Sequence, residues 1–165
     1  MNNNQNFRRN CCCRTCLAAR SSRNAFGGMN LHNVQYQYTE PYDPFVVPFD
    51  NPQPLSNMDF ITPNLIIMED GLYQVTFNVD FSTSFNSYVR VQATSGDGVL
   101  PALSTSVNTQ GRNITNVSQS ALVCLKAGQH LGATITLTEY SQIIYLPANG
   151  AGMTAVRIGN CGTPF

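Results

Sequence analysis

The sequence predicts an all-β protein, an antiparallel two-sheet jelly-roll sandwich of about eight to ten strands. An extended, mostly irregular and cysteine-rich N-terminal tail precedes the sandwich. From residue 65 onward, apolar and polar residues alternate with a period of two, as they do in half-buried strands. Turn signals rich in Gly, Asn and Asp separate these runs. No stretch after residue 34 keeps apolar residues at helical spacing over three turns, so helices are not expected.

The composition limits the class of protein. The 165 residues suffice for one domain with a complete core, and the 42% hydrophobic content excludes a disordered chain. Charged residues make up only 11%, against about 25% in an average globular protein. No apolar run approaches the roughly 18 residues that span a bilayer, and the first residues lack the apolar stretch of a secretory signal. We therefore expect neither a membrane protein nor export through a signal peptide.

Residues 1–33 are expected to form a flexible, basic tail, because they are rich in Asn, Arg, Ser and Cys and show little apolar periodicity. This segment holds five arginines and no acid, whereas the rest of the chain carries nine acidic and four basic residues. The five arginines are spread along the segment without a recognised binding fold, which gives weak electrostatic attraction to phosphates. Nucleic acid is therefore not expected as a partner.

Residues 34–64 contain six prolines and should form extended edge strands and loops. Proline removes a backbone donor and forces the residue before it into an extended conformation. Helix is excluded in this segment, and we expect the first strands of the sandwich here.

Residues 65–165 form the predicted main body. Between Leu72 and Phe81, the odd-numbered residues are Tyr, Val or Phe, whereas Gln, Thr, Asn and Asp occupy the even positions that follow Leu72. This pattern is typical of a strand with one buried face. Similar runs predict further strands at 88–93, 120–125, 133–138, 142–146 and 153–158. Periodicity alone leaves an immunoglobulin-like sandwich open, but the absence of tryptophan removes the Cys–Trp–Cys pattern of those domains and favours the jelly roll.

Four residues are interpreted as defining the fold. Gly71 follows Glu69 and Asp70, where a tight turn into a strand favours a positive φ, and Gly128 has the same role between two later strands. Tyr73 and Phe77 are expected to stack inside the sandwich.

Three segments in order carry a family resemblance: residues 64–79, with a Gly-x-Tyr sequence before an aromatic strand, residues 120–131 and the last strand, 152–158. They resemble the jelly-roll superfamily of complement globular heads and tumour necrosis factors over about residues 45–159. The Ser-, Thr- and Asn-rich texture is most similar to the C-terminal domain of collagen-like glycoproteins on the exosporium of spore-forming bacteria. The chain departs from these by lacking a Gly-x-x collagen repeat, in whose place it has the cysteine-rich tail.

The sequence lacks the parts of an enzyme or of a cofactor site. It has two histidines, His32 and His130, and its carboxylates are scattered, so neither a zinc site nor a Ser–His–acid triad can be assembled. His130 is interpreted as an exposed or trimer-facing strand residue. Asp70 and Asp97 lie beside glycines and could supply oxygens to calcium, but solvated turn aspartates are the preferred interpretation. No cofactor or metal is expected.

The cysteines are the most informative polar residues. Four of them lie within six residues of the tail, and vicinal cysteines form only strained bonds with each other. Intermolecular disulfide bonding is the favoured interpretation, with metal binding and unpaired thiols as alternatives. Cys161, beside glycines near the C-terminus, is a candidate partner for the tail, and Cys124 could be a buried thiol. The candidates for intermolecular disulfides are Cys11, Cys12, Cys13, Cys16 and Cys161.

Two functions follow as hypotheses. The first is a structural, self-assembling protein of the spore surface, in the exosporium or an appendage, whose jelly-roll trimers are cross-linked through the tail and bind other cysteine-rich spore-layer proteins. The alternative is an adhesin-like head that presents loops to a receptor or glycan. The resemblance implies a homotrimer, and we expect the tail to contain no core residue before about position 45. Surplus apolar positions that could form the trimer are Ile143, Ile144, Tyr145, Val156 and Ile158.

Overall fold

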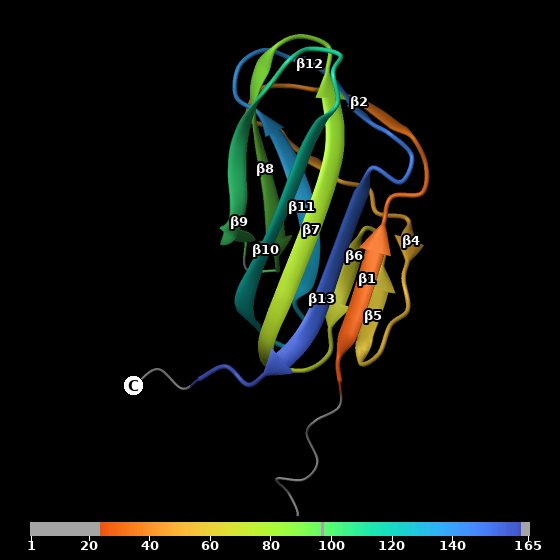
Figure 1. Cartoon of the computed structure of the whole chain (residues 1–165), viewed down its shortest axis with the longest axis vertical. Coiled ribbons are helices and arrows are strands. Elements are labelled where there is room, and N and C mark those ends of the chain that lie inside the picture. The colour runs from red at the N-terminus through yellow and green to blue at the C-terminus, as the bar shows by residue number, and fades with distance from the viewer. Residues whose placement is uncertain (1–23, 97, 163–165) are drawn as a thin grey trace, which may run out of the picture.

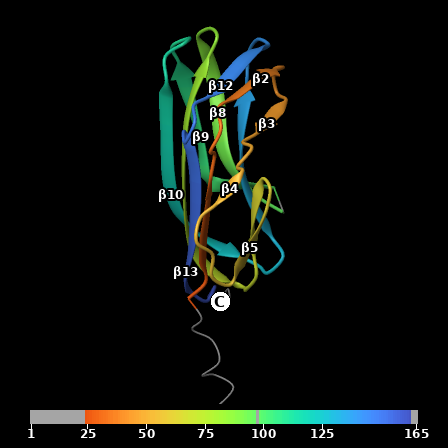
Figure 2. The ribbon, with the colours of Figure 1, turned by 90° about the vertical axis from the view of Figure 1, so that its right-hand side faces the viewer.

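The computed structural model describes residues 24–96 and 98–162, which form two antiparallel sheets packed face to face (Figure 1). Seen from the side, β10 and β13 lie in one layer and β3 and β5 in the other (Figure 2). This is the all-β sandwich that the alternation predicts. The described residues contain thirteen strands, more than the eight to ten expected, because several are only two to five residues long. They include no helix long and apolar enough to cross a membrane.

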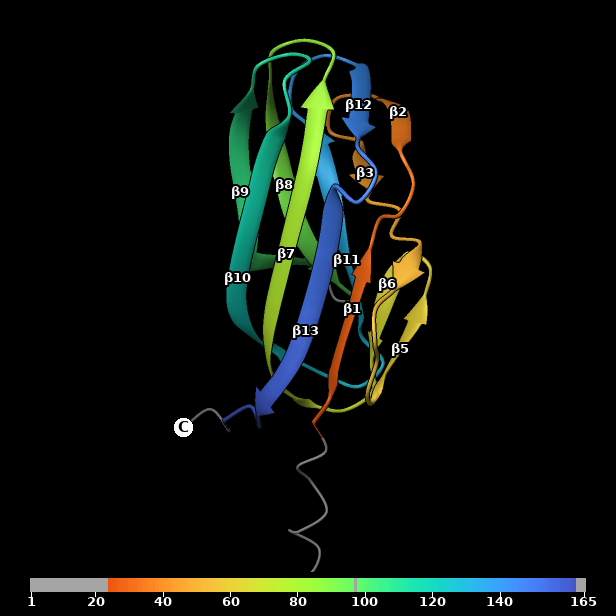
Figure 3. The same cartoon turned by 45° about the vertical axis from the view of Figure 1, so that its right-hand side comes forward.

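The seven-stranded sheet has the order β2-β12-β7-β13-β1-β4, with β10 paired along the other edge of β7 (Figure 3). The long strand β7 is the central strand of this sheet. The first part of β7 pairs with β13, its last residues pair with β12, and β10 pairs with nearly its whole length. The strands of this sheet are β1 (Phe26–Asn30), β2 (Gln35–Thr39), β4 (Asn51–Pro52), β7 (Gly71–Thr83), β10 (Thr115–Leu125), β12 (Gln142–Leu146) and β13 (Ala151–Gly159).

The six-stranded sheet has the order β5-β6-β11-β8-β9, with β3 paired to β11. Its strands are β3 (Pro44–Val46), β5 (Met58–Ile61), β6 (Asn64–Ile67), β8 (Ser87–Ser95), β9 (Gly98–Thr109) and β11 (His130–Leu137).

The core lies between the inner faces of the two sheets. The aromatic and valine residues of β7 that alternate in the sequence, among them Tyr73, Phe77 and Phe81, are all fully buried. Opposite them lie aliphatic side chains of β8 and β11, such as Val91 and Ile135, which are also fully buried. Removing this apolar surface from water is the main stabilising contribution to a sandwich of this size.

The sequence-based boundary of the tail at residue 33 is wrong, because β1 lies inside that segment. β1 pairs with β13, and Ala25, Met29 and Leu31 are buried in the core. The expectation that no core residue precedes position 45 is therefore also wrong. The sequence of β1 shows no alternation of apolar and polar residues, because it contains Gly27 and Gly28. A Cβ at these positions would have its nearest neighbouring atom at 2.9 Å and 3.1 Å, respectively. Glycine leaves the room that adjacent segments fill.

Strand β9 was not predicted from the sequence, because Pro101 and a run rich in Ser and Thr break its apolar alternation. In the structure β9 pairs only with β8 and forms an edge of its sheet. An edge strand tolerates proline, since the missing N–H group can lie on the side with no partner strand.

Gly71 is required for a reason other than the predicted one. Gly98 and Gly128 are the described glycines with positive φ, and Gly128 has the left-handed value of 87° expected of it. Gly71 is instead the buried first residue of β7. A Cβ there would clash with the Arg157 side chain and would lie 2.8 Å from the carbonyl oxygen of Gly159. The end of β13 therefore excludes a side chain at this position.

Candidate functional site: the outer faces of the two sheets

The outer face of the six-stranded sheet is mainly polar. Its outward residues on β8, β9 and β11 are mostly Ser, Thr, Asn, Gln and Arg. The large apolar side chains exposed on this sheet are isolated, since no two of them are cross-strand partners. Each lies opposite a polar residue: Val46 opposite Thr134, Ile61 opposite Asn64, Tyr88 opposite Asn108, and Val99 opposite Thr94.

The outer face of the seven-stranded sheet carries clustered apolar side chains near the start of β1 and the ends of β10 and β13. This is the lower end of the sheet in Figure 1, where both described ends of the chain lie. Phe26 on β1 is the cross-strand partner of Val156 on β13, and Val156 is in turn the partner of Gln74 on β7. The other partner of Gln74 is Leu122 on β10. Ile158 follows on β13 and is also exposed. We call Phe26, Leu122, Val156 and Ile158 the lower cluster.

A polar belt crosses the middle of the same face. Thr76 on β7 is the partner of Ser120 on β10, and their hydroxyl oxygens are 2.8 Å apart. One row further up, Asn78 faces Ser118. Beyond it, the amide of Asn116 donates to the carboxylate of Asp80. Two of these three polar pairs are hydrogen-bonded across the strands, and together the three rows separate the lower cluster from the upper end of the sheet.

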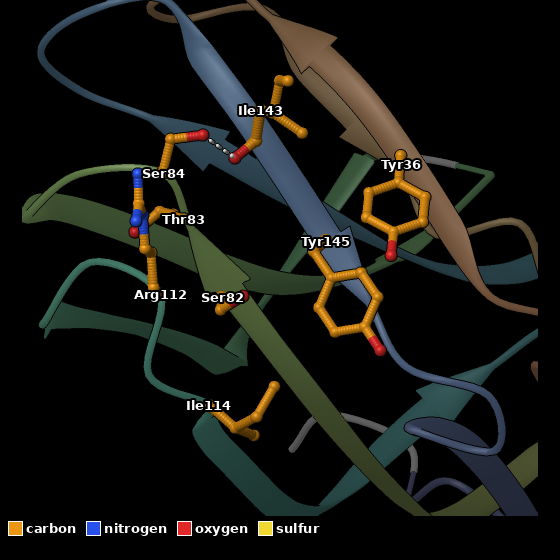
Figure 4. Close-up of a pocket in the computed structure, with 8 residues that line it drawn as sticks. All are labelled: Tyr36, Ser82, Thr83, Ser84, Arg112, Ile114, Ile143 and Tyr145. Carbon is orange, nitrogen blue, oxygen red and sulfur yellow. Dashed lines mark hydrogen bonds between the residues drawn. The ribbon is translucent and has the colours of Figure 1, made fainter.

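The upper end of this face is hollowed. The cross-strand row runs from Tyr36 on β2 to Tyr145 on β12 and Ser82 on β7, and Ile114 lies just before the start of β10. Ser82 is small and lies between large neighbours, which leaves a hollow of about 390 Å³. In Figure 4 the two tyrosines lie on one side of β7, and Arg112 and Ile114 lie on the other. We call this cavity the upper hollow.

The upper hollow combines aromatic rings, hydroxyls and one cation. The rings of Tyr36 and Tyr145 have centroids 4.8 Å apart and are tilted by 37°. Arg112 is the one charged residue among those that line it, and Ser82 and Ser84 add hydroxyls. The sequence interpretation missed Tyr36, Ser82 and Arg112. The available signals were the Gly111-Arg112-Asn113 turn and the alternating tyrosines of β2.

The residues expected to form a trimer lie at opposite ends of one face. Val156 and Ile158 belong to the lower cluster, whereas Ile143 and Tyr145 line the upper hollow. Ile144 points inward and is fully buried, so it cannot contribute to a surface contact. The parity of β12 explains this, because successive side chains of a strand point to opposite faces.

Cys161 is bonded within the chain, which corrects its assignment as an intermolecular candidate. It forms a disulfide with Cys124 across 37 residues, with the two Cα atoms 5.7 Å apart. Cys124 is exposed at the end of β10 and is therefore not the buried thiol considered from the sequence. The pairing arises because β10 and β13 both end beside the start of β7, so that Cys161, two residues after β13, comes close to Cys124. The other candidates, Cys11, Cys12, Cys13 and Cys16, lie outside the described residues.

The histidines and turn aspartates have structural surroundings. His130 is exposed at the start of β11, and the backbone N–H of His32 donates to Asp50. The Asp70 carboxylate accepts a hydrogen bond of 2.8 Å from the N–H of Ala127 and so fixes a turn. Asp97 lies outside the described part of the chain. Within the described ranges, no three His, Cys, Asp or Glu side chains are grouped so as to hold a metal ion.

Two groups have shifted pKa values. Burial raises the pKa of the Tyr73 hydroxyl above its ordinary value of 10.0, and this hydroxyl donates to the carbonyl of Glu69 over 2.7 Å. Tyr73 therefore stays neutral and supports the turn before β7. Burial also raises the pKa of Asp50, but hydrogen bonds from the His32 N–H and the Asn33 amide outweigh it, and the net pKa is lowered. Neither group lies in the upper hollow.

Comparison with known proteins identifies the fold. No protein-family model matches the sequence, and no curated protein matches it. Among solved structures, the chain is similar to an Eiger TNF from S. frugiperda, with a TM-score of 0.62 and 14% identity over 86% of this chain and 97% of that one. It is also similar to murine APRIL, with a TM-score of 0.59 and 10% identity over 82% of this chain and all of that one. The chain thus has the jelly-roll fold of tumour-necrosis-factor-like structures.

Proposed function

We propose that this protein is a structural, self-assembling jelly roll of the bacterial spore surface, which trimerises through the lower cluster and is cross-linked by its N-terminal cysteines. The lower cluster is the observation that supports this most directly. Phe26, Val156 and Leu122 are 41%, 44% and 58% exposed although they lie in one cross-strand row. Phe26 and Val156 adjoin, and the exposed Gln74 lies between Val156 and Leu122. Exposed apolar side chains clustered in this way are stabilised when a second copy covers them.

The position of the chain ends supports cross-linking at the same place. The N–H of Arg157 donates to the carbonyl of Ala25, so the first described residues lie against the end of β13 (Figure 3). Cys16 is eight residues before Asn24, and a fully extended segment of that length spans at most about 28 Å. Copies that share the lower cluster would bring their tails within reach of one another, and disulfides would then join the chains of one trimer. Each tail has four cysteines, and the remaining thiols are proposed to connect neighbouring trimers.

The spore surface is proposed from the resemblance to exosporium domains together with the composition. A charged content of 11% and a single lysine suit a durable layer with few charges to hydrate. Other cysteine-rich proteins of that layer are proposed as further disulfide partners.

Trimer formation is tested by comparing Val156→Arg with Val46→Arg in the full chain under reducing conditions. The two valines are 44% and 47% exposed, each on a strand, but they lie on opposite sheets. Light scattering should give three chain masses for the wild type and for Val46→Arg, and one for Val156→Arg. A monomeric wild type, or a Val156→Arg variant that stays trimeric, would falsify the proposed interface.

Cross-linking is tested by replacing Cys11, Cys12, Cys13 and Cys16 by serine. The variant should keep the circular dichroism spectrum of the wild type, because the residues from Ala25 onward already supply the core cluster between the two sheets. It should lose the multimers that survive boiling in detergent without reductant. In the wild type, a covalent bond easily outweighs the entropic cost of a few kcal/mol for restraining a flexible segment. Large boil-resistant species in the serine variant would remove the main support for a cross-linked layer.

A further inference from the structure

The upper hollow lies at the end of the seven-stranded sheet away from the lower cluster, and the polar belt separates the two. Its size is at the small end of the range of about 300–1,000 Å³ that is typical of ligand pockets. The hollow is therefore suited to a small ring rather than to the flat face of a protein. A ligand in this hollow would not require trimerisation, because the lower cluster lies at the other end of the sheet.

The aromatic wall of the hollow is exposed to solvent. Tyr36 is 70% exposed and contacts Tyr145 at a centroid distance of 4.8 Å. Both rings belong to adjacent strands, so the backbone pairing of β2 with β12 fixes their relative position. Such a pair offers apolar ring faces together with phenolic hydroxyls, which suits ligands that have both C–H and O–H groups on one ring.

The opposite wall carries an unpaired cation. Arg112 adopts a φ of 68°, held by a 2.6 Å hydrogen bond from its N–H to the carbonyl of Thr83. This turn holds its backbone beside the end of β7. Among the described residues, no hydrogen bond or ion pair engages its guanidinium, and no carboxylate lines the hollow. A guanidinium in this setting attracts a carboxylate and can bind it through two parallel hydrogen bonds.

The floor carries a hydroxyl that is available to a ligand. Ser82 is only 7% exposed, and its hydroxyl has no hydrogen-bond partner in the described part of the chain. The small part of Ser82 that stays exposed lines the hollow, so its hydroxyl is available to hydrogen-bond a ligand there in place of water. Ser84 lies close by, with its hydroxyl 3.5 Å from the carbonyl of Ile143, which is a weak contact (Figure 4).

We propose that the upper hollow binds a single carboxylated sugar residue, such as a hexuronate at the end of a glycan. Arg112 pairs with the carboxylate, the rings of Tyr36 and Tyr145 contact the C–H face of the sugar, and Ser82 hydrogen-bonds to a ring hydroxyl. A neutral sugar retains the ring and hydroxyl contacts but lacks the charge-assisted pair. An aliphatic carboxylate retains the pair but lacks the ring contacts. The complete combination therefore selects the acidic sugar.

The test measures binding of methyl β-D-glucuronide, methyl β-D-glucoside and acetate to the full chain by titration NMR. The glucuronide should bind saturably and at least about tenfold more tightly than either other compound, because a hydrogen-bonded charge pair and the ring contacts each contribute. Arg112→Gln should lower glucuronide affinity about tenfold or more while leaving the weak glucoside binding unchanged. Tyr36→Ala should weaken both sugars and leave acetate binding unchanged.

Matched controls come from other parts of the surface. Arg90→Gln removes an exposed arginine from the six-stranded sheet, and Tyr140→Ala removes a tyrosine that is 61% exposed outside the hollow. Both controls should bind the glucuronide as the wild type does, and all variants should keep the wild-type circular dichroism spectrum.

Three results would overturn the proposal: no saturable glucuronide binding, equal affinity for glucuronide and acetate, or glucuronide binding that is unaffected by Arg112→Gln. Because Val156→Arg leaves the upper hollow intact, that variant should bind the glucuronide normally. Failure of the trimer and failure of the sugar site are thereby distinguishable.

Discussion

The two sheets use their faces differently. The seven-stranded sheet supplies large aromatic side chains to the core and carries clustered apolar residues and the upper hollow on its outer face. The six-stranded sheet supplies mainly aliphatic side chains and covers its outer face with Ser, Thr and Arg, among which apolar residues stand singly. The comparison indicates that the six-stranded sheet closes the core against solvent, whereas the outer face of the seven-stranded sheet carries two surfaces, the lower cluster and the upper hollow, for which we propose different partners.

The seven-stranded sheet is also the one that is tied covalently. The Cys124–Cys161 disulfide joins the end of β10 to the segment after β13, and β7 lies between these two strands. The described part of the six-stranded sheet contains no cysteine. The sheet that we expect to contact other copies therefore has an additional constraint on its lower end.

The largest expected effect tests the inner faces. Phe77→Ala should lower the free energy of unfolding by about 3–5 kcal/mol, because Phe77 is fully buried on the central strand and its loss leaves a cavity. Val91→Ala, on the facing β8, removes two methyl groups and should cost about half as much. Urea denaturation at one fixed protein concentration measures both variants. A larger cost for Val91→Ala would contradict the view that the aromatic sheet dominates the core.

The second prediction concerns the disulfide. In a chain whose tail cysteines are serine, replacing Cys124 and Cys161 by serine should cost about 2–4 kcal/mol, since the bond closes a loop of 37 residues in the unfolded chain. Adding reductant to the chain that retains these two cysteines serves as the control and should produce the same loss. If stability is unchanged in both cases, the bond does not constrain the lower end of the sheet.

The third prediction concerns the junction of β7 with β13. Gly71→Ala should cost about 1–3 kcal/mol, because the new methyl group would overlap the Arg157 side chain and the backbone of Gly159. Gly159→Ala is the matched control, since a Cβ there meets no atom within 4 Å, and it should change stability by less than about 0.5 kcal/mol. Thermal unfolding of the two variants distinguishes a steric requirement at position 71 from a general preference for glycine.

The smallest expected effect is a pH dependence at the edge of the seven-stranded sheet. Asp50 accepts hydrogen bonds from the His32 N–H and the Asn33 amide, and its pKa in the folded protein is below the ordinary value of 3.8. Its contribution to stability is therefore present above pH 3.8 and lost as the pH falls through the lower folded pKa. The stability difference between wild type and Asp50→Asn should shrink over that acidic range. A difference that stays constant with pH would show that these hydrogen bonds do not depend on the charge.

Much of the fold could be predicted from local pattern. The alternation in β7 is a property of ten consecutive residues, and the same holds for the runs that became β8, β10, β11, β12 and β13. Strands β1 and β9 could not be predicted, because glycines in one and a proline in the other remove the alternation, and both depend on a neighbouring strand for their pairing. The upper hollow could not be predicted from local pattern either. Its lining residues Tyr36, Ser82 and Arg112 come from segments far apart in the chain.

The sequence by itself determined that the chain is all-β, which of its later segments are strands and which face of each is buried, because the two-residue period of a strand is local. Only the tertiary structure decided which strands are neighbours and in which register they pair. Register places Phe26 beside Val156, Tyr36 beside Tyr145, and Cys124 within bonding distance of Cys161. A shift of one residue in any of these pairings would turn the side chains of one strand to the other face. The lower cluster, the upper hollow and the disulfide therefore exist only in the folded sheet.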